Sequence, residues 1–459
     1  MVTDLALQRD KYKHLSDEEW RWFLQQVEGR ERTVDKLPTF AAIEDWWYPV
    51  RLSCEQCSSE LTARYKAQIV LGTWSNGTCL DLTGGYGVDT YFLSEHFART
   101  DYVEQNAELC RIAAQNFSLS QKSKVERQKL SITVHNCTAE EFLSSPLHGG
   151  NEGGYSLIFL DPARRDSHGG KVFKLADCTP NVVELLPALL DHLAPNGQIM
   201  LKLSPMIDIT QAIKELQTPP ERFYDRPLDA QSGKALHPSR EEIIWDVHIV
   251  AVKNEVKEVL LLSRCLKAPI NNRVVNDQIN DKMVNDQIIK CIDLSRPEQA
   301  FTFTREEERD TTLPPFERVK SSARSDCRWP SVELPGVGFA GSWIYEPNAA
   351  ILKAGAYKLV GERFSLQKLD PNTHLYISDR LVEHFPGRVW RINDKMVNAK
   401  MVNGQMANVL CRNYPLTPEQ LKKKLHLRDG GTAYVIGCRV AGKPVVLLAE
   451  RVEDVHAEG

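Results

Sequence analysis

The spacing of apolar residues predicts a helical segment at the start of the chain. Trp20, Phe23 and Leu24 recur at the i, i+3, i+4 spacing that places side chains on one face of a helix. An S-x-x-E pattern that begins at Ser16 gives this helix a capping box at its N-terminus. We therefore predict that residues 1–75 form a helical cap that packs against the segment after it.

The middle of the chain shows a different pattern, in which short apolar runs alternate with amphipathic stretches of helix length. The runs are TCLDL, DYVEQ, SITVH, SLIFLD and QIMLKL, and the stretches between them include AELCRIAAQNF and NVVELLPALLDHL. Strands that alternate with helices predict an α/β fold with a Rossmann-like, doubly wound and mostly parallel sheet. The later runs EIIWDVHIVAV and EVKEVLLLSRC predict two antiparallel strands at one edge. This domain is expected to cover residues 76–265.

The rest of the chain predicts two smaller domains. We expect residues 266–330 to form a small linker domain, with a ferredoxin-like fold as one candidate. We expect residues 331–459 to form a small α+β domain with a helix that begins near Thr417. The heptapeptide INDKMVN occurs twice, at Ile279–Asn285 and at Ile392–Asn398. Its polar, biased composition predicts two low-complexity insertions that loop out of folded elements.

Composition and charge exclude several classes of protein. Of the 459 residues, 42% are hydrophobic and 26% are charged, which is typical of globular proteins and excludes wholesale disorder. The 57 Lys and Arg against 61 Asp and Glu leave a net charge of −4, so contact with nucleic acid would need a local basic patch. No apolar run approaches the roughly 18 residues of a membrane span, and the start lacks the apolar region of a signal peptide. We therefore expect a cytoplasmic protein without a membrane partner.

The cysteines give no indication of a metal site. Eleven cysteines are scattered along the chain, apart from the pair Cys54 and Cys57, and reduced thiols are expected. The C-x-x-C spacing of this pair is half of a zinc site, but no second C-x-x-C or H-x-x-x-H pattern follows it. We therefore predict no bound metal.

The candidate chemistry is concentrated where the first predicted strand ends. Asp81 ends this strand, and the glycine-rich turn Thr83–Gly87 leads into a predicted helix. Glycines allow a backbone to approach a ligand closely, and a helix N-terminus offers free N–H groups. Glu104 ends the second strand, 23 residues after Asp81, where an acid reaches the ribose hydroxyls of a nucleoside in Rossmann-like folds. The pattern predicts a site for a nucleoside-containing cofactor.

The order of residues in the turn narrows the choice of cofactor. The turn lacks the GKS or GKT of a P-loop and the G-x-G-x-x-G of dinucleotide-binding proteins. An acid beside the turn would also repel a pyrophosphate, whereas it would attract a cationic ligand such as a sulfonium.

The sequence DLTGGYG resembles motif I of the class I S-adenosylmethionine-dependent methyltransferases, and Glu104 resembles their ribose-binding acid. Thr83 stands where the first glycine of the motif is usual. In HNCTAEEFL, Thr138 and Ala139 stand where the family commonly has an Asp or another polar residue that faces the adenine. The resemblance implies S-adenosyl-L-methionine as the cofactor, bound by Asp81, Thr83, Gly84, Gly85, Gly87, Asp89, Glu104, Thr138 and Ala139.

A second motif, FLDPARR, is similar to the fourth motif of these enzymes, whose amine-methylating members carry Asp/Asn-Pro-Pro-aromatic. The resemblance implies that Asp161 and the carbonyl of Pro162 are catalytic, because both could accept hydrogen bonds from an exocyclic amine and orient its lone pair. Ala163 and Arg164 replace the end of that motif, so the stacking aromatic residue is absent. The alternative interpretation is a structural Asp-Pro turn in which Arg164 or Arg165 pairs with a neighbouring acid.

The order of domains resembles a group of bacterial methyltransferases that carry a C-terminal THUMP-like domain. The resemblance implies an enzyme that methylates a base nitrogen in structured RNA, such as tRNA or rRNA, with Arg164, Arg165 and Lys202 as candidates for phosphate contacts. The basic run Lys422–Lys424 fits either an RNA contact or a solvated helix face. Two alternatives stay open, namely a methyltransferase that acts on a protein or small molecule, and a catalytically degenerate RNA-binding protein that keeps the fold.

Overall fold

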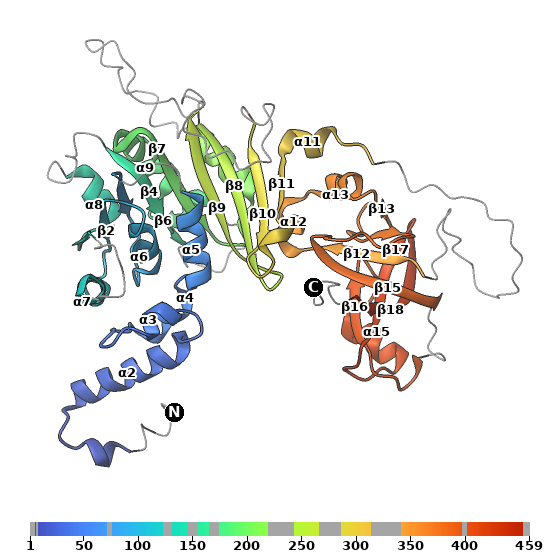
Figure 1. The fold of residues 1–459 in the computed structure, drawn as a ribbon, viewed down its shortest axis with the longest axis horizontal. Coiled ribbons are helices and arrows are strands. Elements are labelled where there is room, and N and C mark those ends of the chain that lie inside the picture. Colours follow the sequence, from blue (N-terminus) through green and yellow to red (C-terminus); the bar gives the residue numbers. More distant parts are fainter. Residues whose placement is uncertain are drawn as a thin grey trace, which may run out of the picture. The chain divides into compact units, whose positions relative to one another are not determined.

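In the computed structural model, the chain folds into two compact units (Figure 1). Unit 1 consists of Met1–His248 and Glu258–Gln287, and unit 2 of Ile249–Lys257 and Ile288–Gly459. The residues that the structure describes are 5, 8–70, 76–122, 131–145, 154–164, 174–218, 243–265, 286–313, 341–396 and 402–452.

Unit 1 begins with helices, as the apolar spacing predicts. The capping box is present, because the Ser16 side chain accepts a hydrogen bond from the Glu19 N–H and the Glu19 carboxylate accepts one from the Ser16 N–H at 2.7 Å. Trp20 is buried, as expected for the apolar face of this helix. The helical elements of this cap are η1 (Arg9–Tyr12), α2 (Asp17–Thr33), α3 (Pro38–Ala41), α4 (Arg51–Gln56) and α5 (Glu60–Ile69).

The sheet of unit 1 confirms the predicted α/β fold. Within unit 1 its strands follow the order β8-β9-β7-β4-β1-β2-β3, with β8 as far as His248 and β9 from Glu258. Strands β7, β4, β1, β2 and β3 are parallel, whereas β9 runs antiparallel to β7. The strands are β1 (Thr78–Asp81), β2 (Arg99–Val103), β3 (Ile132–His135), β4 (Tyr155–Leu160), β7 (Leu193–Leu203), β8 (Ile243–Val252) and β9 (Glu255–Cys265).

Helices connect these strands, so the unit is built from βαβ segments. They are α6 (Val88–Ser94), α7 (Ala107–Lys122), α8 (Ala139–Ser144), α9 (Val182–Asp191) and α10 (Ile209–Gln217), and the shorter elements are β5 (Ala163–Arg164), η2 (Leu175–Asp177) and β6 (Cys178–Thr179).

The order of strands reverses at β1, which pairs with β2 on one side and with β4 on the other. Open α/β sheets bind their ligands outside the carboxyl ends of the strands at such a reversal point. Asp81 ends β1, and Asp161 directly follows β4. The fold therefore brings both acids to the same edge of the sheet.

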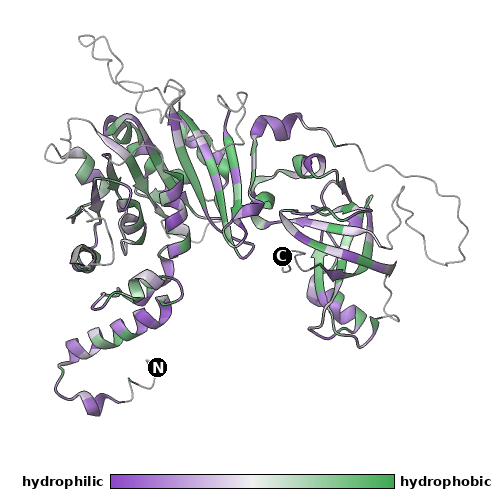
Figure 2. Ribbon diagram, viewed as in Figure 1, coloured by the Kyte–Doolittle hydropathy of each residue, from purple (hydrophilic) through white to green (hydrophobic). Residues whose placement is uncertain are grey.

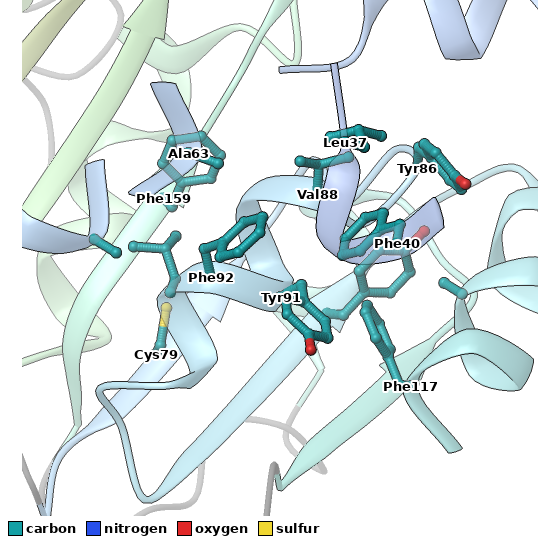
Figure 3. Close-up of a cluster of buried hydrophobic side chains, with 14 of the residues drawn as sticks. Leu37, Phe40, Ala63, Cys79, Tyr86, Val88, Tyr91, Phe92, Phe117 and Phe159 are labelled. Carbon is teal, nitrogen blue, oxygen red and sulfur yellow. The ribbon is translucent and has the colours of Figure 1, made fainter. Parts of the chain in front are cut away.

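The cap and the sheet share one hydrophobic core (Figure 3). The ring of Phe40, in α3, is fully buried and lies 4.2 Å from the ring of Trp46. It also lies 5.0 Å from the ring of Tyr91 and 5.9 Å from that of Phe92, both in α6. The N-terminal helices are therefore part of the core of unit 1 rather than an appended segment.

Unit 2 contains a seven-stranded sheet with the order β13-β14-β12-β15-β18-β17-β16. Only β16 and β17 are parallel among its described strand pairs. The strands are β12 (Trp343–Pro347), β13 (Gln367–Lys368), β14 (Tyr376–Ser378), β15 (Gly387–Met396), β16 (Asn408–Arg412), β17 (Ala433–Val440) and β18 (Lys443–Arg451). The unit also contains α12 (Ala349–Ala354), α13 (Tyr357–Arg363), α15 (Pro418–Leu425), the antiparallel pair β10 (Ile288–Asp293) and β11 (Phe301–Thr304), η7 (Pro297–Gln299) and α11 (Arg305–Asp310).

Hydropathy follows these elements (Figure 2). Hydrophilic residues dominate α2 and α11, whereas long hydrophobic stretches lie in the strands of the sheets. In unit 2, the buried side chains of Ile344, Trp390 and Leu447 form part of the core. Glu346 is also buried there, where it pairs with Arg388 at 2.6 Å and with Arg412. Pairing of this kind is what allows a carboxylate to be buried.

The second INDKMVN copy corrects an expectation from the sequence. Residues Ile392 to Met396 continue strand β15, and Ile392 is buried in the core, so this part of the copy does not loop out. The pairing of β15 with β18 shifts register between Ile392 and Met396, which indicates a bulge that absorbs the irregularity. The first copy, Ile279–Asn285, lies outside the described residues.

In the described part of the chain, no helix is long and apolar enough to cross a bilayer. Within the same residues, His, Cys, Asp and Glu side chains form no group of three or more that could hold a metal ion. Cys54 and Cys57 are free thiols, and burial raises the pKa of Cys54 to about 12.

We predict that Phe40→Ala lowers the free energy of unfolding by about 3–5 kcal/mol, because removal of a buried ring leaves a cavity in the core that the cap and sheet share. Equilibrium unfolding in urea measures the change. Val34→Ala, at a side chain that is 44% exposed, is the control. A loss below about 1 kcal/mol for Phe40→Ala, in the range of ordinary surface substitutions, would contradict a shared core.

Candidate active site

The turn between β1 and α6 depends on its glycines. Gly87 is the N-cap of α6 with a φ of +83°, a conformation that glycine adopts at no steric cost. A Cβ at Gly84 would overlap the ring of Tyr102. The hydroxyl of Tyr102 also donates a hydrogen bond to the Gly85 carbonyl at 2.6 Å. The glycines therefore let the turn fold back onto β2, where the ribose-binding acid was predicted.

The carboxylate of Asp81 is hydrogen-bonded to this turn and to α6. Asp81 is buried, and its carboxylate accepts hydrogen bonds from the Thr90 hydroxyl at 2.5 Å and from the Thr83 N–H at 2.9 Å. Burial raises the pKa of Asp81 to about 7, while the bonds from Thr90 and Thr83 oppose the rise and the nearby charges of Asp89 and Asp161 add to it. Asp81 therefore changes its charge close to neutral pH.

The side chain of Glu104 contacts the backbone of the turn. Its Oε2 accepts the Gly85 N–H at 2.9 Å, and its Oε1 accepts the Asn106 N–H at 2.8 Å. Asn136, after β3, donates from Nδ2 to the Glu104 carbonyl at 2.9 Å. A carboxylate has about four acceptor positions, so each oxygen keeps capacity for a further hydrogen bond.

Asp161 connects the turn to the end of β4. Its N–H donates to the Thr83 hydroxyl at 2.6 Å, which ties the two loops together at the reversal point of the sheet. Its Oδ2 pairs with the ammonium of Lys202, in β7. The Asp161 side chain is 41% exposed and that of Lys202 only 13%, so the carboxylate faces outward and the lysine lies beneath it. Pro162 is buried.

The ammonium of Lys202 lies between two carboxylates of the site. Burial would lower its pKa, but the carboxylates of Asp161, Asp89 and Glu258 raise it well above the ordinary value of a lysine. The ammonium lies 4.0 Å from Asp89 Oδ2 in addition to its pair with Asp161. Lys202 is therefore a permanent cation that holds Asp161 in place, and its predicted contact with a phosphate stays a prediction.

The sequence analysis did not identify two further charged residues in this region, Lys66 and Glu258. Lys66, in α5, is fully buried and donates to both oxygens of Glu258, in β9, at 2.9 and 2.8 Å. It also pairs with Asp89 Oδ1 at 3.1 Å. The available signal was a lysine beside the buried residues Thr62, Ala63 and Ala67 of α5.

The remaining predicted residues lie around this edge or outside the described part. Thr138 is the N-cap of α8, where its hydroxyl accepts the Glu141 N–H at 3.1 Å, and Ala139 is buried in the first turn. The threonine therefore has a capping role that the T-x-x-E spacing could have shown. The side chain of Arg164 and the whole of Arg165 lie outside the described residues.

Comparison with known proteins agrees with this architecture. Residues 343–386 match a ferredoxin-like domain family, and residues 387–451 match a family described as THUMP domain-like. The chain is similar to the crystal structure of a putative methyltransferase from Porphyromonas gingivalis W83, with 27% identity, coverage of 96% of this chain and 92% of that chain, and a TM-score of 0.70. A tRNA (m1A58) methyltransferase from Aquifex aeolicus matches at 15% identity, 46% and 71% coverage and a TM-score of 0.29. A comparison with curated proteins gave no match.

The sheet order and the similarity over nearly the whole chain show the fold of the class I methyltransferases. Residues 387–451 form a THUMP-like domain, which follows a ferredoxin-like segment in unit 2.

We predict that Asp81→Asn flattens the dependence of stability on pH. The folded carboxyl keeps its proton up to about pH 7, whereas the unfolded one releases it near pH 4. The folded state therefore binds more protons between these values, and the contribution of Asp81 to stability is present at low pH and is lost as pH rises from about 4 to about 7. Unfolding titrations across this range measure it. Parallel curves for the two proteins would contradict the raised pKa.

Proposed function

We propose that the protein transfers the methyl group of S-adenosyl-L-methionine to a base nitrogen in structured RNA. The observation that carries the proposal is the hydrogen-bonded arrangement of three acids around one glycine turn. Glu104 accepts the Gly85 N–H, Asp81 accepts the Thr83 N–H, and Asp161 donates its own N–H to the Thr83 hydroxyl. These contacts support the proposal, because Glu104 suits a ribose, Asp81 a sulfonium and Asp161 a nucleophile.

The residues at this edge fit the cofactor. S-adenosyl-L-methionine supplies an electrophilic methyl group on a positively charged sulfur. The spare acceptor capacity of Glu104 suits the two ribose hydroxyls, as in other Rossmann-like sites. Among the described residues, a Cβ at Gly85 would have only the Thr83 carbonyl within 4 Å, at 3.8 Å, so these residues leave room for a ligand to approach the backbone. The carboxylate of Asp81, beside the turn, suits a cationic group.

Asp161 and Pro162 suit the orientation of an amine nucleophile. Lys202 engages Asp161 Oδ2, and the described residues place no hydrogen bond on Oδ1. Oδ1 and the Pro162 carbonyl could then accept the N–H groups of an exocyclic amine and direct its lone pair toward the methyl group. Methyl transfer is an in-line displacement, so a site gains most by holding the two reacting atoms about 3–3.5 Å apart.

An RNA substrate is supported by the C-terminal part of unit 2. Residues 387–451 match the THUMP-like family, and α15 in this segment presents an exposed basic surface. The exposed basic residues are Lys423 and Lys424 in α15 and His426 and Arg428 directly after it. Glu419 and Asp429 are also exposed, and Asp429 pairs with Lys422. Clustered cations of this kind bind phosphates through a local patch, even in a chain whose net charge is negative.

We predict that Glu104→Ala weakens the affinity for S-adenosyl-L-methionine by about 10- to 100-fold, because hydrogen bonds to a charged group contribute roughly 1.5–3 kcal/mol. Calorimetric titration measures the dissociation constant. Glu108→Ala is the matched control, since Glu108 is a nearby carboxylate that is 50% exposed and pairs with Arg111. Equal affinity in the wild type and Glu104→Ala would remove the ribose assignment.

We predict that Asp161→Ala lowers methyl transfer by about 100-fold or more, because the nucleophile loses its orientation, and leaves the affinity for the cofactor within about threefold. The assay follows labelled methyl groups from S-adenosyl-L-methionine into tRNA and rRNA pools that lack this modification. Full transfer by Asp161→Ala would contradict its catalytic role.

The same assay separates the alternatives. Label that enters protein or small molecules, and not RNA, would favour a methyltransferase of another substrate class. Cofactor binding without transfer to any RNA pool would favour an RNA-binding protein that keeps the fold without its chemistry.

A further inference from the structure

Lys66 is the second member of a row of charges that begins at the buried Glu258 and reaches the surface at Asp161. In order, the members are Glu258, Lys66, Asp89, Lys202 and Asp161, and we call this row the ion chain. Their side chains are 4%, 0%, 11%, 13% and 41% exposed. The charges alternate in sign along the row. Only its last member, the predicted catalytic acid, is open to a substrate.

The contacts are closest at the two ends of the ion chain and looser in the middle. Lys66 binds both oxygens of Glu258 and lies 3.1 Å from Asp89 Oδ1. The Ser58 hydroxyl donates to Asp89 Oδ2 at 2.7 Å and accepts from Lys66 at 3.3 Å. Lys202 pairs with Asp161 but lies 4.0 Å from Asp89 Oδ2. Lys202 is therefore shared between an inner and an outer carboxylate.

Lys66 determines how strongly the inner carboxylates attract Lys202. Burial would raise the pKa of Asp89, but Lys66, followed by Lys202, lowers it below the ordinary value. Glu258 also acts on Lys202 electrostatically, and Lys66 offsets its charge directly. Without Lys66, two buried carboxylates would lack their main counter-charge, and Lys202 would be the nearest cation to them among the described residues.

We propose that Lys66 is a positioning residue for methyl transfer, because its neutralisation of Asp89 and Glu258 leaves Lys202 in place to hold Asp161. The inference rests on the proposed function of Asp161. It assigns the N-terminal helix α5 a part in the reaction, although α5 supplies no group that touches the substrate.

The physical asymmetry of buried ion pairs makes the proposal testable. Removal of one partner leaves an uncompensated charge and is strongly harmful, whereas replacement of both partners by apolar residues is often tolerated. Lys66→Met should therefore draw Lys202 inward and away from Asp161. Lys66→Met combined with Glu258→Leu removes one charge of each sign and should restore the position of Lys202.

The experiment compares these two variants with the wild type by kinetics and by NMR of the lysine ammonium groups. We expect Lys66→Met to lower kcat by about 10- to 100-fold with KM for the cofactor changed less than about threefold, because misplacement by about an ångström has effects of this size. We expect the ¹⁵N resonance of Lys202, assigned by its loss in Lys202→Met, to shift in Lys66→Met. The double variant should recover most of kcat and return the resonance toward its wild-type position.

Arg264→Met is the matched control, because it breaks a largely buried ion pair between β9 and β8. Arg264 pairs with Asp246 at 2.8 Å, with side chains 14% and 13% exposed, and neither residue belongs to the ion chain. This variant should lose stability while kcat per folded molecule and the Lys202 resonance stay unchanged. If Lys66→Met does not fold, Lys66→Gln, which keeps donors for both carboxylates without the charge, takes its place.

The outcomes separate the inference from the proposed function. An unmoved Lys202 resonance with full kcat in Lys66→Met overturns the inference, as does a loss of kcat that Arg264→Met reproduces or that the double variant does not restore. If the wild type transfers no methyl group to any substrate, the proposed function fails. The Lys202 resonance then decides alone whether Lys66 positions this lysine.

Discussion

Burial of charge is the constraint on which the candidate site depends. Asp81, Asp89 and Glu258 are almost completely removed from water, and an ionised carboxylate in that position is costly unless a cation or hydrogen-bond donors compensate it. The chain meets this requirement in two ways. Asp89 and Glu258 share the ammonium of Lys66, whereas Asp81 is held by Thr90 and the Thr83 N–H and has a pKa raised by burial to about 7.

This pairing explains why the N-terminal helices belong to the core of unit 1. Lys66 comes from α5, Asp89 from α6, Lys202 from β7 and Glu258 from β9, so the counter-charges come from segments far apart in the sequence. The aromatic cluster around Phe40 holds the cap against α6, and α6 carries Asp89. The aromatic packing and the ion pairs of Lys66 therefore both stabilise the interface between the cap and α6.

The sequence was sufficient to predict the features that arise from local pattern. Apolar runs gave the strands, alternation gave the parallel sheet, and the spacing from Asp81 to Glu104 placed an acid where its carboxylate meets the Gly85 N–H. Lys66 and Glu258 could not be paired in this way, because they are 192 residues apart and each is ordinary in its own element. The second INDKMVN copy misled for a related reason, since a polar composition does not reveal that a strand continues through a bulge.

The central claim is that the turn after β1, together with Glu104, binds S-adenosyl-L-methionine. The most direct measurement is a calorimetric titration of the wild-type protein with S-adenosyl-L-methionine and, separately, with NAD. The account predicts saturable binding of S-adenosyl-L-methionine at one site per chain and no binding of NAD, whose pyrophosphate would meet the acids of the turn. Binding of NAD alone, or of neither compound in the presence or absence of RNA, would contradict it.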